Sequence, residues 1–286
     1  MSLLDNFEPK HKATAFHILG VAHAIADGNY PTCPFTSKSS FFSKALIEAG
    51  YKVFYYGVEG GEVVCTKFVP IVSKETFFKA YPTVEDTTKN HFSDVDGVAW
   101  EEYFKKGPDA VKQNIVDPER DIILPFFGYP QEAITGPSEL ITIEPGIGHP
   151  GSFAKYRIFE SYAYQNICYG KEGKDDHSSK WPHSYDHVIP NFYFPEMYPF
   201  SAKKEDYLMF MGRVTWGKGI SLAVELANYL NMKLIVAGSG DVREAVPESI
   251  PLDNVEYKGI LKFDEKLDYM KRAKAFLAPS QYMEPF

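Results

Sequence analysis

Cysteine is scarce in this sequence, and the three cysteines that occur lie far apart. Cys33, Cys65 and Cys168 form no CxxC pair in a chain of 286 residues, so neither a disulfide framework nor a zinc site is indicated. A reduced, cytoplasmic setting fits this composition best. The N-terminus has no apolar segment of the signal-peptide kind, and no apolar run approaches the roughly 20 residues that span a bilayer. These absences predict a cytoplasmic protein and leave peripheral membrane contact open.

An excess of basic residues is also missing. The chain has 30 Lys and Arg against 38 Asp and Glu, a formal net charge of −8 at pH 7. General nucleic-acid binding needs a basic surface, so the charge argues against a nucleic-acid partner. Hydrophobic residues make up 44% of the sequence and aromatic residues 15%, which is enough material for the cores of two domains.

The clearest pattern in the sequence lies in residues 207–286. Apolar runs predict buried strands at 207–211, 232–241, 254–259 and 274–280, and helical apolar spacing marks 218–230 and 263–273. Strands that alternate with helices predict an α/β fold with a doubly wound parallel sheet. Ligands of such sheets bind outside the carboxyl ends of the strands.

Glycine and charged residues follow the ends of these strands. Gly212, Arg213 and Lys218 lie between the first strand and its helix. Glycines at such a turn let backbone N–H groups approach an anion at the positive end of a helix, and the two cations would neutralise a diphosphate. The residues after the remaining strands are Gly238, Gly240, Gly259 and Glu284. The pattern therefore predicts a phosphate-binding turn at one edge of a sheet.

The first half of the chain predicts a second sheet of the same kind. A strand at 13–21 reaches Gly20, a helix with an apolar face of Phe42, Leu46 and Ala49 stops at Gly50, and further strands are expected at 51–60, 121–128 and 139–148. Between them, 93–116 is predicted to be helical in part and broken by Gly107 and Pro108. His17 and His23 flank Gly20 and are expected to be structural.

A shaped loop follows the strand at 139–148. It contains three glycines and two prolines, and Ser152 or Ser161 is expected to precede a helical, aromatic-rich segment. His149 lies in this loop, at a carboxyl end where ligands bind. Glu144 and Arg157 are interpreted as an internal ion pair rather than as ligands. The histidines and aspartates of 175–187 have no spacing typical of a metal site, so no metal is predicted.

The order strand, GRVTWGKG, helix, strand, AGSGD, strand, VEYKG, helix, strand, PSQYMEPF resembles the second domain of GT-B glycosyltransferases, specifically the retaining family 4 group. EPGIGHPGSFAKYRIFESYA, with PTCPFT and VIPNFY, is similar to a bacterial and phage-type subset of that group. The resemblance implies two Rossmann-like domains with parallel sheets facing a central cleft. The expected limits are 1–194 for an acceptor-side domain, 195–206 for a linker, and 207–286 for a partial nucleotide-sugar-binding domain that stops before the family's second glutamate.

The resemblance also implies roles for particular residues. Arg213 and Lys218 would hold the donor diphosphate, and Glu284 would bind donor hydroxyls and take part in catalysis. His149 is the other catalytic candidate and stands where the subset usually has Tyr. The remaining expected contacts are Gly212, Gly238, Gly259 and Ile260 on the donor side, and Gly20 with His149 on the acceptor side. Such enzymes need no cofactor, because the nucleotide-sugar is a co-substrate.

The resulting expectation is a hexosyltransferase-type glycosyltransferase of glycan biosynthesis that retains configuration. Its donor would be a nucleotide-sugar, and its acceptor a glycan, a lipid-linked molecule or a small molecule. Two alternatives stay open: a nucleotide-sugar epimerase of similar fold, and a non-catalytic protein that binds sugar nucleotides. A dinucleotide fold is disfavoured, because the GxGxxG fingerprint fails at Arg243.

Overall fold

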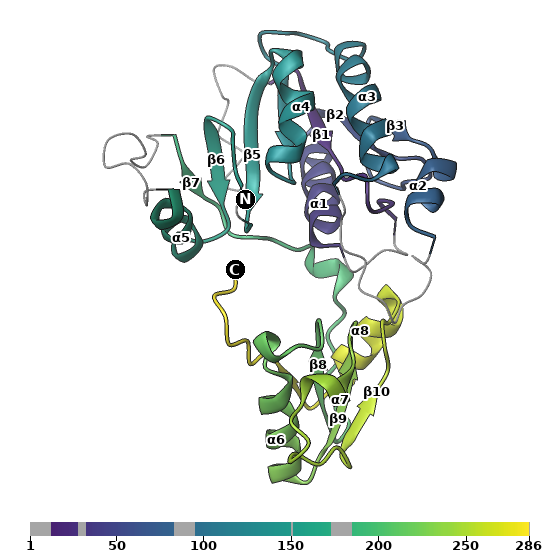
Figure 1. The fold of residues 1–286 in the computed structure, drawn as a ribbon, viewed down its shortest axis with the longest axis vertical. Helices are drawn as coiled ribbons and strands as arrows, with labels where there is room; N and C mark the ends of the chain where they lie inside the picture. The colour runs from purple at the N-terminus through teal and green to yellow at the C-terminus, as the bar shows by residue number, and fades with distance from the viewer. Residues whose placement is uncertain (1–12, 28–32, 83–94, 150, 173–184, 286) are drawn as a thin grey trace. The chain divides into compact units, whose positions relative to one another are not determined.

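The computed structural model describes residues 13–27, 33–82, 95–149, 151–172 and 185–285. The chain forms two compact units. Among the described residues, the first unit takes those up to Ala80, those up to Asn191 after the gap, and Pro285, and the second takes Tyr81, Pro82 and Phe192–Glu284. Each unit contains one parallel sheet with helices packed on it (Figure 1). The α/β fold that the sequence predicts is confirmed, whereas the domain limits and the linker at 195–206 stay predictions.

Within its described residues, the first unit is built on a sheet in the order β3-β2-β1-β4-β5-β6-β7, and every neighbouring pair is parallel. The strands are β1 (Ala15–Leu19), β2 (Lys52–Val58), β3 (Lys67–Val72), β4 (Ile122–Pro125), β5 (Ile141–Ile147), β6 (Tyr156–Phe159) and β7 (His187–Val188). The chain builds outward from β1 in one direction and then returns to add β4 on its other side. The strand order therefore reverses between β1 and β4, which is where doubly wound sheets bind ligands.

Helix α1 (Pro34–Glu48) shows how the local sequence sets helix ends. Pro34 occupies the first helical position, where its fixed φ is favourable, and Gly50 follows the helix with a φ of +85°. The stop predicted at Gly50 is confirmed. Ala49 lies past the helix end and is exposed, so its place on the apolar face was wrong. The described part of the unit also contains α2 (Lys74–Ala80), α3 (Val98–Lys112), α4 (Glu132–Thr135), α5 (Tyr162–Glu172) and the 3-10 turns η1 (Tyr129–Gln131) and η2 (Gly136–Ser138).

The break predicted at Gly107 and Pro108 is wrong, because α3 runs through both residues. A proline inside a helix removes one hydrogen bond and costs about 3 kcal/mol. The helix buries Trp100 and Tyr103 completely, and burial of one such side chain contributes about 1.5–3 kcal/mol. Packing also explains why residue 107 is glycine, since a Cβ there would collide with the side chain of Ile134. Tertiary packing thus outweighs the local preference.

The sequence analysis missed strand β6, because it assigned 156–159 to the segment that leads into the following helix. Arg157 is buried in this strand. A charged residue is not expected at a buried position, so the segment lacks the apolar pattern of a strand. The guanidinium is compensated by Asp186, with Nη2 at 2.8 Å from Oδ2 and Nε at 3.1 Å from Oδ1. An ion pair buried against a neighbouring element is invisible to hydrophobic periodicity.

The second unit follows the predicted alternation closely. Its described strands are β8 (Tyr207–Met211), β9 (Lys233–Ala237), β10 (Val255–Tyr257) and β11 (Ala275–Leu277), in the parallel order β10-β9-β8-β11. The connecting elements are η3 (Pro195–Met197), η4 (Trp216–Lys218), α6 (Ile220–Leu230), α7 (Val242–Ala245) and α8 (Phe263–Arg272). Because β11 lies on the free side of β8, this sheet reverses its strand order between those two strands.

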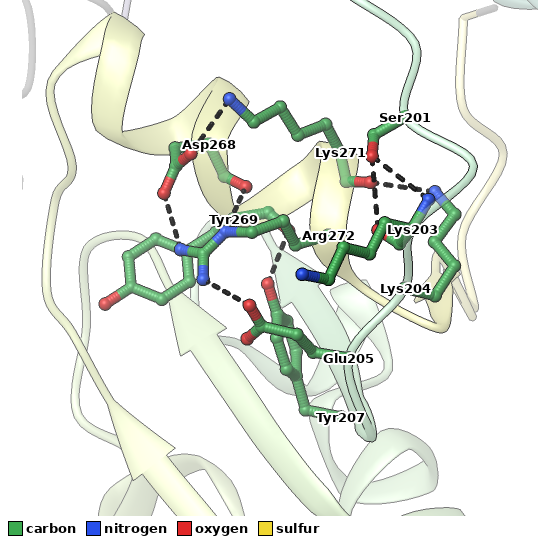
Figure 2. Close-up of polar contacts among 9 residues, drawn as sticks. All are labelled: Ser201, Lys203, Lys204, Glu205, Tyr207, Asp268, Tyr269, Lys271 and Arg272. Carbon is green, nitrogen blue, oxygen red and sulfur yellow. Dashed lines mark hydrogen bonds and ion pairs between the residues drawn. The ribbon is translucent and has the colours of Figure 1, made fainter.

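Successive residues of β8 point to opposite faces of the sheet and fill two cores. Leu208 and Phe210 pack on the side of α6, and Tyr207 and Met209 pack on the side of α8. On the α8 side the Tyr207 hydroxyl also donates to the Tyr269 carbonyl, at 2.8 Å (Figure 2). None of the helices in the described ranges is long and apolar enough to span a membrane.

Candidate functional site

The carboxyl edge of the second sheet brings together the glycines that the sequence singled out. Gly212 follows β8, Gly238 follows β9 and Gly259 follows β10. The Gly212 amide donates to the Ala237 carbonyl at 3.0 Å, and the Gly238 amide donates to the Gly259 carbonyl at 2.8 Å. Three turns from different strands are therefore tied into one continuous backbone layer.

Glycine is required in this layer because the turns lie very close to each other. A Cβ on Gly238 would overlap the Gly212 carbonyl oxygen, and Gly238 has a φ of +143°, which only glycine adopts readily. Gly240 has a φ of +118°, and a Cβ there would lie 2.8 Å from the Val214 carbonyl oxygen. The Val214 amide donates to the Ser239 carbonyl at 2.7 Å. The turn after β9 is therefore held against the turn after β8.

Lys218 and Glu284 meet at the reversal between β8 and β11. The Lys218 ammonium lies 2.5 Å from Glu284 Oε1, and the Ser280 hydroxyl donates to the same oxygen at 2.6 Å. The Tyr282 hydroxyl donates to Oε2 at 2.8 Å, and the Lys218 ammonium lies 4.9 Å from the centre of the Tyr282 ring. One lysine and one carboxylate are thus held in place by two hydroxyl side chains.

The pKa values of this pair move in opposite directions. Burial opposes the charge of Lys218, but hydrogen bonds and charge from Glu284 and Tyr282 outweigh burial and raise the pKa of Lys218 above its ordinary value. Burial likewise opposes the charge of Glu284, but the hydrogen bonds from Lys218, Ser280 and Tyr282 lower its pKa. Both side chains are therefore charged at neutral pH.

Arg213 differs from Lys218 in its surroundings. Its side chain is exposed and pairs with no acidic residue in the described part of the chain. Ile260 is half-buried just past the Gly259 turn. The structure therefore places all the predicted donor-side residues at one sheet edge, while direct side-chain contact joins only Lys218 and Glu284. Their roles toward a ligand stay predictions.

Gly20, on the predicted acceptor side, is explained by packing within its own unit. A Cβ there would lie 2.9 Å from the Tyr55 hydroxyl and 2.9 Å from the Tyr56 carbonyl oxygen. The Gly20 carbonyl accepts hydrogen bonds from the Tyr103 hydroxyl and from Gln131 Nε2, each at 2.7 Å. The fold itself requires glycine at this turn, and contact with an acceptor stays a prediction.

His149 lies against the turn that follows β4. Its Nε2 would be 2.9 Å from a Cβ on Gly128, and its ring meets Phe35 edge to face with centroids 5.2 Å apart. Neither ring nitrogen has a hydrogen-bond partner among the described residues. Burial first, and then the charge of Lys38, lower the pKa of His149 to about 4, so the ring is neutral at pH 7. The Nε2 atom lies 3.9 Å from Glu144 Oε1, which is beyond hydrogen-bond distance. The neutral imidazole is therefore available to one donor and one acceptor.

Lys38 is a further polar residue near His149 that sequence reasoning missed. Its ammonium forms an ion pair with the buried Glu160 and donates to the Gly146 carbonyl at 3.1 Å. The two contacts join α1 to β5 and to the residue that follows β6. No local spacing in the sequence signals the ion pair, because Lys38 and Glu160 come from distant segments.

The other histidines flanking Gly20 have structural surroundings. His17 is fully buried, with Nδ1 at 2.8 Å from the Tyr56 hydroxyl and Nε2 at 3.3 Å from Asp121 Oδ2. His23 Nε2 lies 3.5 Å from the Cys33 sulfur, and burial lowers the pKa of His23 to about 4. His17 is part of β1, His23 lies in the loop that follows it, and both have contacts within the first unit.

The remaining charged candidates also have internal contacts. Glu144 is buried and accepts hydrogen bonds from the Phe153 and Ala154 amides at 2.9 and 3.3 Å. Asp186 pairs with Arg157, as described above. Within the ranges that the structure describes, no three His, Cys, Asp or Glu side chains gather in a way that could hold a metal ion. His177, His183, Asp175 and Asp176 lie outside those ranges.

Three hydroxyl residues at the second sheet's edge were not singled out by the sequence. Ser280 and Tyr282 hold Glu284, and the Tyr257 hydroxyl lies 2.8 Å from the Gly238 carbonyl and 2.7 Å from the Gly240 carbonyl. The available signal is positional, since each residue lies at or near the end of a predicted strand on the ligand side. Hydroxyl residues are too common in such positions to stand out.

Comparison with known protein families gives a match for the part of the chain that contains this site. A family model described as Glycosyl transferases group 1 matches residues 199–286. Comparison with curated protein sequences gives no match. The matched residues contain every donor-side candidate, including Lys218 and Glu284.

Solved structures share the fold over nearly the whole chain. AviGT4, a glycosyltransferase involved in Avilamycin A biosynthesis, has a TM-score of 0.60 and 19% identity, covering 94% of this chain and 69% of its own. Anabaena Alr3699/HepE in complex with UDP and glucose has a TM-score of 0.56 and 10% identity, covering 96% and 76%. UDP-N-acetylglucosamine 2-epimerase from Rickettsia bellii has a TM-score of 0.50 and 8% identity, covering 92% and 73%.

At these identities the solved structures establish the architecture, and the family model matches most of the second unit. Two parallel sheets, each with a reversal of strand order, agree with both findings. The chain therefore has the GT-B fold, and its residues 199–286 match the family model of the group 1 glycosyl transferases.

Proposed function

We propose that this protein transfers a hexosyl group from a nucleotide-sugar to an acceptor hydroxyl and retains the configuration of the sugar. The observation that carries the proposal is the meeting of Lys218 and Glu284 at the strand-order reversal of a group 1 glycosyl transferase domain. A cation for a diphosphate and a carboxylate for sugar hydroxyls lie together at the position where such sheets bind ligands.

In this proposal Arg213 and Lys218 bind the diphosphate of the donor. Arg213 is an exposed cation with a fork of donors that suits phosphate oxygens. Lys218 would exchange its contact with Glu284 for one with a phosphate. Positive charge fixed beside the leaving diphosphate stabilises the negative charge that develops there in the transition state. The backbone amides of the glycine turns would contribute in the same way.

Glu284 would then accept hydrogen bonds from hydroxyls of the donor sugar. Its lowered pKa keeps it ionised, and an ionised carboxylate is an acceptor only. Ser280 and Tyr282 would hold its orientation while the sugar binds. During transfer the bond from the anomeric carbon to the phosphate oxygen breaks, and a bond to the acceptor oxygen forms on the same face of the sugar.

The acceptor hydroxyl would lie near Gly20 and His149, the acceptor-side residues. A neutral His149 can hydrogen-bond this hydroxyl but is a weak base, because its pKa is about 4. The acceptor proton would therefore pass to the leaving phosphate oxygen. The acceptor class, whether glycan, lipid-linked or small molecule, is to be identified by assay, as is peripheral membrane contact.

Calorimetric titration with UDP, GDP and ADP, and then with their sugar conjugates, tests the donor site. We expect one nucleotide to bind and Arg213→Ala or Lys218→Ala to weaken it at least tenfold, as expected when a charged contact to phosphate is lost. Lys233→Ala is a matched control, because Lys233 is an exposed cation at the opposite, amino end of β9.

The outcomes separate the proposal from its alternatives. Donor binding that survives both Arg213→Ala and Lys218→Ala would show that the diphosphate site is wrong. Conversion of the donor to an epimer without any acceptor would identify an epimerase. Tight binding with neither reaction, across glycan, lipid-linked and small-molecule acceptors, would identify a sugar-nucleotide-binding protein.

A further inference from the structure

The side chain of Tyr257, at the end of β10, reaches across to the neighbouring turn. Its hydroxyl lies 2.8 Å from the Gly238 carbonyl oxygen and 2.7 Å from the Gly240 carbonyl oxygen. A phenol has one proton, so that proton is shared between the two carbonyls. Burial and the charge of Asp241 raise the pKa of the Tyr257 hydroxyl, which therefore keeps its proton at neutral pH.

This contact determines which way two peptide groups face. A trans peptide is planar, and its N–H points opposite to its C=O. The Gly238 carbonyl belongs to the same peptide as the Ser239 amide, and the Gly240 carbonyl to the same peptide as the Asp241 amide. With both carbonyl oxygens against the Tyr257 hydroxyl, both of those N–H groups point away from that hydroxyl.

Tyr257 adds a contact to a turn that is also held by the Val214 amide and the Gly259 carbonyl. Gly238 and Gly240 have φ values of +143° and +118°, and glycine at these angles has more accessible conformations than any other residue. The Gly238 amide donates to the Gly259 carbonyl and the Ser239 carbonyl accepts from the Val214 amide, whereas the Gly238 and Gly240 carbonyls contact the Tyr257 hydroxyl. Backbone N–H groups that share an orientation are the feature by which turns bind phosphate oxygens.

We propose that Tyr257 is a positioning residue for donor binding, whose hydroxyl holds the 238–241 turn with its Ser239 and Asp241 amides directed at the donor diphosphate. The inference rests on the proposed function and adds to it a residue that acts through the backbone. Tyr257 itself does not contact the diphosphate.

Tyr257→Phe in the full chain tests the proposal, because it keeps the ring and removes only the hydroxyl. Titration with UDP, GDP and ADP should show that the preferred nucleotide binds about three- to tenfold more weakly, the effect of one lost hydrogen bond. Amide hydrogen exchange of residues 238–242 without ligand should become faster. The value of kcat at saturating donor should stay close to that of the unchanged protein, while KM for the donor rises.

Tyr207→Phe is the matched control, since it also removes a hydroxyl-to-carbonyl hydrogen bond of 2.8 Å from the same unit (Figure 2). It should change neither nucleotide affinity nor exchange at 238–242. Equal losses of affinity in both variants would overturn the positioning role and indicate general destabilisation. Unchanged affinity in Tyr257→Phe would overturn this inference alone, whereas an unchanged protein that binds no nucleotide would overturn the proposed function together with it.

Discussion

Replacement of Gly238 by alanine should be among the most damaging single changes in the second unit. The φ of +143° costs a non-glycine residue about 1–3 kcal/mol. The new Cβ would overlap the Gly212 carbonyl oxygen, and relief of that overlap requires the turns after β8 and β9 to separate. Separation breaks the hydrogen bonds Gly212 N–H to Ala237 O and Gly238 N–H to Gly259 O, each worth about 0.5–1.5 kcal/mol. The expected loss of unfolding free energy is about 2–6 kcal/mol.

Urea denaturation followed by circular dichroism measures this loss, with Gly259→Ala as the comparison. Gly259 has a φ of +66°, yet a Cβ there would meet nothing within 4 Å, so the expected loss is only the left-handed strain of about 1–2 kcal/mol. Equal losses in the two variants, or a loss below about 1 kcal/mol for Gly238→Ala, would refute the steric reasoning. Such a result would also remove the argument that close backbone contact shapes the donor side.

Three further predictions concern single side chains. Because the pKa of Glu284 is lowered, its contribution to stability is present above its ordinary pKa of 4.5 and is lost as pH falls; Glu284→Gln should therefore reduce the acid sensitivity of the second unit in urea melts at pH 7 and pH 4. His149, with an ordinary pKa of 6.5 and a folded pKa of about 4, should make the first unit lose about 3 kcal/mol as pH falls through this range, and His149→Phe should abolish that part of the loss in thermal melts. Pro108→Ala should stabilise α3 by about 1 kcal/mol or more, whereas Gly107→Ala should destabilise it by collision with Ile134; equal signs in calorimetry would contradict the packing argument.

The sequence predicted most of the fold because the relevant signals are local. Tyr207–Met211 is a continuous apolar run and forms β8 with the expected bounds, and Gly50 ends α1 through its own φ. The failures involve contacts between distant segments. Arg157 looks polar until Asp186 is placed beside it, and Pro108 looks like a helix break until the burial of Trp100 is known.

The same distinction applies to the candidate site. Residue type and position at strand ends pointed to Lys218 and Glu284, but only the pairing of β11 with β8 brings the two within 2.5 Å of each other. Tyr257 could not be inferred, because its role depends on where a side chain from β10 meets the turn after β9. Spatial order of strands is the information that hydrophobic periodicity lacks.

The contact between Lys218 and Glu284 couples the two halves of the proposed donor. A free nucleoside diphosphate that draws Lys218 away leaves a carboxylate without its cation, and so binds more weakly than its phosphate contacts alone would suggest. A sugar that engages Glu284 removes this penalty, since the carboxylate regains hydrogen bonds as the lysine leaves. The difference in binding free energy between an intact nucleotide-sugar and the nucleotide product should therefore exceed the contribution of the sugar contacts alone. Weaker binding of the nucleotide would help the product to dissociate after each turnover.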